Sequence, residues 1–274
     1  MRRPAALAAL LLLTACSPAG CGQTGSGPET VDPSPGDPVA PVEPDAPAGP
    51  PAPETPPEPE PVDWPHEAAG GLAPGSGSGA TDPTVWAAGM RFPMKEGPAY
   101  ANSQVYGYGG FAAPGPGGQC DPRNYSYPWR DNFCETRSWT NGMCPAGRGH
   151  QGQDIRPATC VKKVHEVVAA ESGRITSIGS YTVTLLGDSG RIYRYLHMDM
   201  PGVHALFPTT ESRTVARGQT LGKVSADFGG SATTIHLHFE IKAPVDTGGG
   251  ATVMFVPTYP SLVDSYGRLL NGAA

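Results

Sequence analysis

The stretch that decides the fold of this chain is Thr233-Thr234-Ile235-His236-Leu237-His238-Phe239-Glu240-Ile241. Apolar and polar residues alternate along it, which predicts a single β-strand over residues 233–241. Successive side chains of a strand point to opposite faces, so His236 and His238 share one face and the apolar residues share the other. Imidazole is a common zinc ligand and an effective proton carrier near neutral pH. The plainer interpretation is two surface histidines on a half-exposed strand.

A second stretch with the same chemistry lies upstream, Gly147-Arg148-Gly149-His150-Gln151-Gly152-Gln153-Asp154-Ile155. Its glycines permit backbone angles that would bring His150 and Asp154 to one point. An imidazole and a carboxylate both suit zinc, and His238 would complete a set of two histidines and one aspartate. Three protein ligands with an open fourth position are typical of a catalytic zinc site. Alone, the pair would be a histidine and an aspartate satisfied within a turn.

A third histidine ends the alternating run Arg191-Ile192-Tyr193-Arg194-Tyr195-Leu196-His197-Met198. By itself His197 would be an exposed or hydrogen-bonded histidine without further function. Beside a metal ion it becomes a candidate for proton transfer or charge stabilisation.

The ordered set of His-x3-Asp, Tyr-x-His and His-x-His resembles the motifs of the lysostaphin/LytM-type zinc endopeptidases. The run Val215-Ala216-Arg217-Gly218-Gln219-Thr220-Leu221-Gly222-Lys223-Val224 is similar to the family's segment before its last histidines. The resemblance covers residues 147–260. It implies a mainly β fold, with the antiparallel sheet of the lysostaphin/LytM (duplicated-hybrid-motif-like) architecture and a groove over the metal. It also implies one zinc ion held by His150, Asp154 and His238, with His197 and His236 as catalytic residues.

The function that this resemblance implies is zinc-dependent hydrolysis of peptide bonds in peptidoglycan cross-links. Many relatives are non-catalytic activators that have lost ligands, and the presence of all five positions favours an enzyme. The alternative is a non-catalytic module that binds peptidoglycan or activates an amidase. A third interpretation is a structural lipoprotein that links an outer membrane to the cell wall.

The N-terminus predicts export. Met1-Arg2-Arg3 precedes an apolar run that is too short to span a bilayer. Leu13-Thr14-Ala15-Cys16 resembles a lipobox, so we expect a signal peptide over residues 1–15 and a lipid anchor on Cys16. This places the protein in the cell envelope, on the outer membrane facing the periplasm if the host is Gram-negative. An ordinary signal peptide with a chance cysteine is the alternative.

Composition predicts a disordered linker over residues 16–83. Fifteen prolines lie between Pro28 and Pro65, and residues 4–90 carry 11 acidic and no basic side chains. Such a stretch buries too little apolar surface to offset its ordering entropy, whether it serves as a tether or as solvated filler. The acidity of the chain, −6 in total, belongs to this part, because residues 91–274 carry 17 basic and 14 acidic side chains. No basic patch indicates nucleic acid as a partner.

The remaining residues, 84–274, are long enough for one domain, with a cysteine-containing elaboration at residues 90–146 that could wall or cover the groove. Strands are expected over residues 164–170, 174–177, 181–186 and 191–198, a hairpin at residues 187–190, and a short helix over residues 261–270. Four cysteines in an exported domain predict two disulfides. Local loop closure favours the pairs Cys120–Cys134 and Cys144–Cys160, and a structural zinc site is the alternative.

Overall fold

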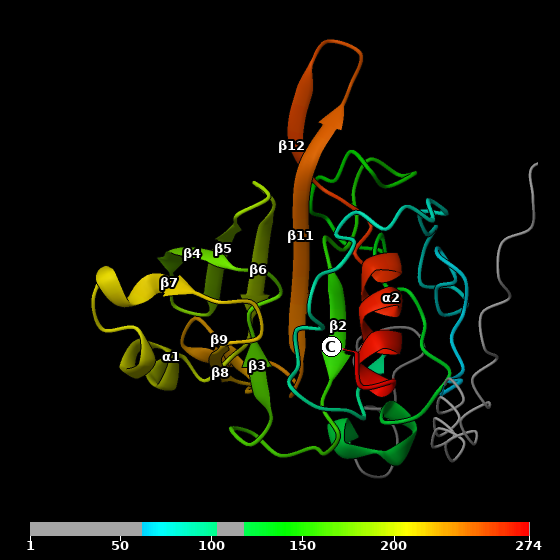
Figure 1. The fold of residues 1–274 in the computed structure, drawn as a ribbon. Coiled ribbons are helices and arrows are strands. Elements are labelled where there is room, and N and C mark those ends of the chain that lie inside the picture. The colour runs from blue at the N-terminus through cyan, green and yellow to red at the C-terminus, as the bar shows by residue number, and fades with distance from the viewer. Residues whose placement is uncertain (1–61, 103–117, 274) are drawn as a thin grey trace, which may run out of the picture. The chain divides into compact units, whose positions relative to one another are not determined.

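The computed structural model describes residues 62–102 and 118–273, and this part of the chain is mainly β, as expected (Figure 1). Its helices are α1 (Met200–Leu206) and α2 (Tyr259–Leu270), with 3₁₀ turns η1 (Gly118–Cys120), η2 (Pro122–Asn124) and η3 (Glu211–Arg213). The strands are β1 (Tyr100–Ala101), β2 (Gln153–Arg156), β3 (Glu166–Val168), β4 (Gly173–Ile178), β5 (Thr182–Gly187), β6 (Ile192–Leu196), β7 (Thr214–Val215), β8 (Thr220–Lys223), β9 (Asp227–Phe228), β10 (Ser231–Ala232), β11 (Leu237–Asp246) and β12 (Ala251–Phe255).

One antiparallel sheet organises these residues, in the order β1-β2-β11-β6-β5-β4-β7, with β12 also paired to β11. Figure 1 shows β11 at the centre, β6, β5 and β4 on one side of it, and β2 and α2 on the other. The register sets His238 opposite Asp154 on β2 and opposite Leu196 on β6. Two elements far apart in sequence are thereby fixed beside the same residue of β11.

The strand predicted over residues 233–241 differs from β11 at both ends. The ladder begins only at Leu237 and runs on to Asp246, so the prediction is wrong for residues 233–236. Their backbone N–H groups find other acceptors: Thr233 donates to the Ala226 carbonyl and Ile235 to the side-chain oxygen of Gln119. His236 therefore lies just before the strand.

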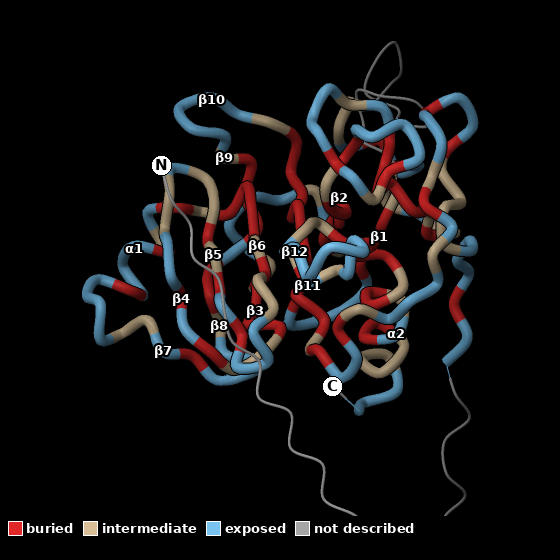
Figure 2. Tube along the Cα trace, turned by 90° about the horizontal axis from the view of Figure 1, so that it is seen from above, coloured by how far each residue is buried: buried red, intermediate tan, exposed pale blue. Residues whose placement is uncertain are grey.

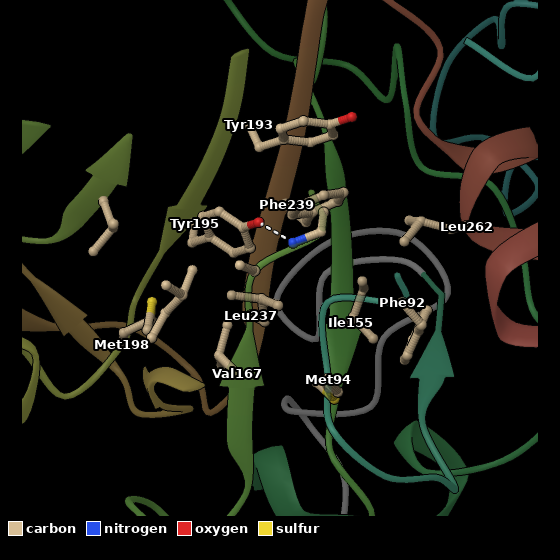
Figure 3. Packing of buried hydrophobic residues seen from close by; sticks show 14 of the residues in the cluster. Phe92, Met94, Ile155, Val167, Tyr193, Tyr195, Met198, Leu237, Phe239 and Leu262 are labelled. Atoms are coloured by element: carbon tan, nitrogen blue, oxygen red, sulfur yellow. Dashed lines mark hydrogen bonds between the residues drawn. The ribbon is translucent and has the colours of Figure 1, made fainter. Parts of the chain in front are cut away.

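The apolar face of β11 is the middle of the core. Leu237 and Phe239 are fully buried, and they pack with Tyr195, Ile155 and Val167 (Figure 3). The Tyr195 hydroxyl accepts a hydrogen bond from the Ala170 N–H at 2.8 Å. Figure 2 shows the same division, because β11 is buried over its first half and the β9–β10 turn is exposed. Alternation along the strand, which the sequence showed, thus produces the core.

The other predicted elements are present with shifted ends. The predicted ranges 164–170, 174–177, 181–186 and 191–198 overlap β3, β4, β5 and β6, and residues 261–270 lie within α2. The hairpin at residues 187–190 joins β5 to β6. Helix α1 was not predicted, because its seven residues are too short for a clear helical period.

Some residues before the boundary predicted at residue 84 are packed against the rest of the domain. Trp64 is only 7% exposed, and its ring lies 4.5 Å from that of Trp129 and 4.8 Å from that of Tyr266 on α2. Ser76 is also buried, and its carbonyl accepts a hydrogen bond from the Thr136 N–H. Residues 62–83 therefore contribute buried side chains to the domain, which their proline- and glycine-rich composition concealed.

Two disulfides form, as expected, but not with the favoured pairing. Cys120 joins Cys160, and Cys134 joins Cys144, with Cα–Cα distances of 5.4 and 5.3 Å. Turns bring Cys144 back toward Cys134, and tertiary packing brings residues 118–120 to Cys160. Sequence separation alone could not distinguish these pairs. The alternative of a zinc site made by these cysteines is excluded, because all four are oxidised.

The predicted signal peptide, the predicted lipid anchor on Cys16 and residues 16–61 of the linker predicted over residues 16–83 lie outside the described residues. Among the residues that are described, no helix has the length and apolar character needed to cross a bilayer.

Candidate metal centre

β2 and β11 bring together the three residues that the sequence nominated as metal ligands. His150 precedes β2, Asp154 lies on β2, and His238 lies opposite Asp154 on β11. His238 Nδ1 lies 2.9 Å from both His150 Nε2 and Asp154 Oδ1, and the latter two atoms are 3.4 Å apart. All three side chains are buried, and among the described residues they form a group that could hold a metal ion.

The outer partners of the two histidines fix which nitrogen faces inward. His150 Nδ1 donates to the Asn132 carbonyl at 2.9 Å, which leaves a lone pair on Nε2. His238 Nε2 donates to Glu240 Oε1 at 2.9 Å, which leaves a lone pair on Nδ1. With Asp154 Oδ1, three electron-pair donors thus face one another, and such a set needs a cation or a proton between them. Ligand atoms of a tetrahedral zinc ion lie about 3.4 Å apart, and the separations here, 2.9, 2.9 and 3.4 Å, are close to that, so the donor set suits zinc.

The electrostatics of these side chains also favour a positive charge. Burial opposes ionisation of Asp154, but the adjacent His150 and His236 outweigh it and hold the pKa of Asp154 well below its usual value. Burial likewise disfavours protonated His238, yet its hydrogen bonds with Asp154 and Glu240 raise its pKa to about 9. The two carboxylates therefore stabilise positive charge at this point, which a divalent cation would supply.

The two remaining histidines lie beside the ligand group with a common orientation. His197 Nδ1 donates to the Asp227 carbonyl and His236 Nδ1 to the Thr234 carbonyl, both at 2.9 Å. Each ring is thereby held through Nδ1, and His236 Nε2 lies 3.4 Å from Asp154 Oδ1. The two ring centroids are 4.7 Å apart. The structure thus gathers all five nominated residues, while their catalytic and ligand roles stay predictions.

His197 is held in an unusual backbone conformation directly after β6. Its φ of +68° is uncommon for a residue other than glycine, and such strain is typical of functional sites. Burial, followed by the neighbouring His236 and His238, lowers the pKa of His197 to about 3. Its imidazole is therefore neutral near pH 7, with its Nδ1–H on the Asp227 carbonyl and a lone pair on Nε2.

A groove of about 500 Å³ opens over His197 and His238. One rim carries Trp139, which is 45% exposed and whose ring lies 6.2 Å from that of His150. The other rim carries Tyr181 and Phe228, both packed around His197. The site is therefore open to a ligand that can lie between two aromatic walls.

Sequence reasoning missed two residues that brace this site. Asn132 accepts the hydrogen bond from His150, and Arg194 pairs with Glu240, the partner of His238. Glu240 bonds directly to His238, whereas the Gln153 side chain accepts the backbone N–H of Asn132. The alternation of β6 and β11 could have paired Arg194 with Glu240, but no pattern in the sequence marks Asn132.

Residues 148–250 match the family model for peptidase family M23. No curated protein matches the chain. Three solved structures similar to it are a putative glycyl-glycine endopeptidase lytM from Ruminococcus gnavus, the lysostaphin catalytic domain from Staphylococcus simulans, and a zinc-containing peptidase from Vibrio cholerae. Their identities are 20, 19 and 27%, with TM-scores of 0.41, 0.31 and 0.28. The matches cover 66, 47 and 42% of this chain and 62, 89 and 35% of theirs, so this chain spans under two thirds of the first.

Proposed function

We propose that this chain is a zinc-dependent endopeptidase that cleaves peptide bonds in peptidoglycan cross-links, since residues 148–250 match the family model for peptidase family M23. One observation carries the proposal. Three buried ligand atoms, from His150, Asp154 and His238, converge under an open groove, with two further histidines beside them. Three protein ligands and an accessible fourth position are typical of catalytic rather than structural zinc sites.

His150, Asp154 and His238 would hold the ion. Bound zinc would supply Lewis acidity toward the scissile carbonyl and a hydroxide nucleophile at neutral pH. Glu240 and the Asn132 carbonyl keep both histidine ligands in the tautomers that this requires.

His197 and His236 would manage the protons. Both donate Nδ1–H to backbone carbonyls, so that Nε2 of each ring would be the atom that takes up a proton from the attacking water. The protonated ring can then return that proton to the leaving amine. It can also stabilise the negative charge that develops on the carbonyl oxygen. The hydrogen bonds that fix both rings would favour this transfer by holding Nε2 in place.

The substrate that we propose is the peptide part of peptidoglycan. In a Gram-negative host the first candidate bond joins D-alanine to diaminopimelate, and glycine bridges are second. A lipid anchor on Cys16 would hold the enzyme at the outer membrane facing this substrate. Fractionation tests the anchor, because a Cys16→Ala variant that still sediments with membranes would contradict it.

The test is digestion of purified peptidoglycan by the full chain, with and without a chelator and after zinc is restored. We expect cross-linked dimers to fall to monomers only in the presence of metal, with product masses that identify the bond. A His197→Ala protein provides the matched inactive control. Zinc binding without cleavage would favour the non-catalytic peptidoglycan-binding or amidase-activating module, and absence of zinc binding would refute the proposal.

A further inference from the structure

Two of the three metal ligands are braced by a residue outside the M23 match, Asn132. It is fully buried, and its backbone carbonyl accepts the Nδ1–H of His150 at 2.9 Å. Its side-chain Oδ1 accepts the backbone N–H of Asp154 at 3.2 Å. One residue therefore orients the ring of one ligand and the backbone of another.

The side chain of Asn132 replaces a missing piece of the sheet. β1 pairs Ala101 with Ile155, so the next pair in register would be Asn102 with Asp154. β1 ends before that pair forms, and the Asn132 amide lies in its place. It accepts from the Asp154 N–H and donates to the Asn102 carbonyl at 3.1 Å. A carboxamide has both a donor and an acceptor, as a peptide group does, which explains why asparagine suits this position.

The segment that carries Asn132 is fixed on every side. Trp129 is fully buried and donates to the Ala99 carbonyl, and the Asp131 carboxylate accepts from Gly70 and Phe133. Cys134, bonded to Cys144, donates its N–H to the His150 carbonyl at 3.0 Å. The Asn132 N–H itself donates to Gln153 Oε1, and Gln153 Nε2 donates to the Arg130 carbonyl. A segment anchored in this way can hold a metal ligand to within a fraction of an ångström.

We propose that Asn132 is a positioning residue of the metal centre, and that the segment before the M23 match completes the site instead of obstructing it. This inference rests on the proposed function, because it concerns the same zinc ion. Loss of a partner of this kind lowers metal affinity by about 10- to 100-fold. A substitution at Asn132 removes the acceptor of the Asp154 N–H but leaves the Asn132 backbone carbonyl in the chain. We therefore expect the loss of affinity to arise from a less well fixed Asp154 and from a shift of the carbonyl that holds His150.

The experiment measures the zinc dissociation constant of the full chain by competition with a chromophoric chelator, and the visible spectrum of the Co²⁺-loaded protein. For Asn132→Ala we expect zinc affinity to fall about 10- to 100-fold and the Co²⁺ bands to shift in position or intensity. Asn124→Ala is the matched control, because Asn124 is also buried but donates to the carbonyls of Gly118 and Gln119, away from the ligands. Its affinity and Co²⁺ spectrum should equal those of the wild type.

A second variant guards against misfolding of Asn132→Ala. Gln153→Met keeps the volume of the side chain but removes the acceptor for the Asn132 N–H, so we expect a smaller loss of affinity in the same direction. The result that would overturn the inference is a folded variant, either of the two, whose zinc affinity is within twofold of wild type and whose Co²⁺ spectrum is unchanged. If the wild type itself bound no zinc, the proposed function would fail first and the inference with it.

Discussion

The central sheet and the segment that precedes it in the chain position functional groups in different ways. In the sheet, strand register alone places Asp154 on β2 and Leu196 on β6 on either side of His238 on β11. In residues 62–102 and 118–146 the regular elements are only β1, η1 and η2. That segment is nevertheless as well buried at Trp64 and Trp129, through aromatic packing, disulfides and hydrogen bonds. The comparison shows that a segment poor in regular structure can still be a rigid part of a site.

The two regions also give the metal centre different groups. The sheet and its flanking residues provide the side-chain atoms that would touch the ion. The preceding segment provides Asn132, whose backbone carbonyl accepts from the His150 ring and whose side-chain amide accepts from the Asp154 N–H. Variants that remove one contribution at a time therefore test whether the two regions differ as we infer.

The largest effect is expected in the sheet. His238→Ala removes one of three ligand atoms and leaves the buried carboxylates of Asp154 and Glu240 without their shared partner. Zinc content after dialysis should fall from about one ion per chain to none, and peptidoglycan cleavage should be lost. Elemental analysis of the dialysed protein measures this. His204→Ala, on the exposed side of α1, is the histidine control and should retain metal and activity.

The next effect separates ligands from proton carriers within the same region. His197→Ala removes a neutral imidazole that bonds to the Asp227 carbonyl and to none of the three ligands. Zinc should stay bound while the cleavage rate falls about 10²- to 10⁴-fold. His236→Ala should behave alike, and loss of metal from either variant would show that it is a ligand after all.

The third effect concerns the packed segment. Trp64→Ala should lower the free energy of unfolding by about 3 kcal/mol, because the ring contacts Trp129 and Tyr266 and is almost fully buried. Trp139, 45% exposed, is the control, and Trp139→Ala should change stability by less than about 0.5 kcal/mol. Urea unfolding followed by circular dichroism gives both values. If the two variants had equal free energies of unfolding, residues 62–83 would belong to the linker and not to the packed domain.

Features set by local sequence patterns could be predicted from the sequence, and features set by tertiary contacts could not. Alternation predicted strands within residues 174–177, 181–186 and 191–198, and the resemblance brought five separated residues to one site, because strand patterns and ligand motifs are local. The burial of Trp64 depends on Tyr266, about two hundred positions along the chain, so composition indicated a linker instead. The role of Asn132 and the pairing of Cys134 with Cys144 depend on tertiary contacts in the same way.

The smallest effect sharpens the comparison, because it removes a brace that belongs to the sheet itself. Arg194 on β6 donates to Glu240 Oε2, and Glu240 Oε1 accepts from His238, so the arginine acts on the ligand through one intermediate. Arg194 is also partly exposed in the groove, where water can replace its hydrogen bond. We therefore expect Arg194→Ala to weaken zinc binding by less than about tenfold, below the effect of Asn132→Ala.

The same chelator competition measures this, with Arg268→Ala as the control, since Arg268 pairs with Asp264 on α2, away from the site. Arg194→Lys should recover part of the loss, because the ammonium group keeps a charge near Glu240 but lacks the planar donor fork of arginine. A larger loss from Arg194→Ala than from Asn132→Ala would reverse the comparison. The sheet would then brace its own ligand more strongly than the packed segment does, and the segment would serve mainly to wall the groove.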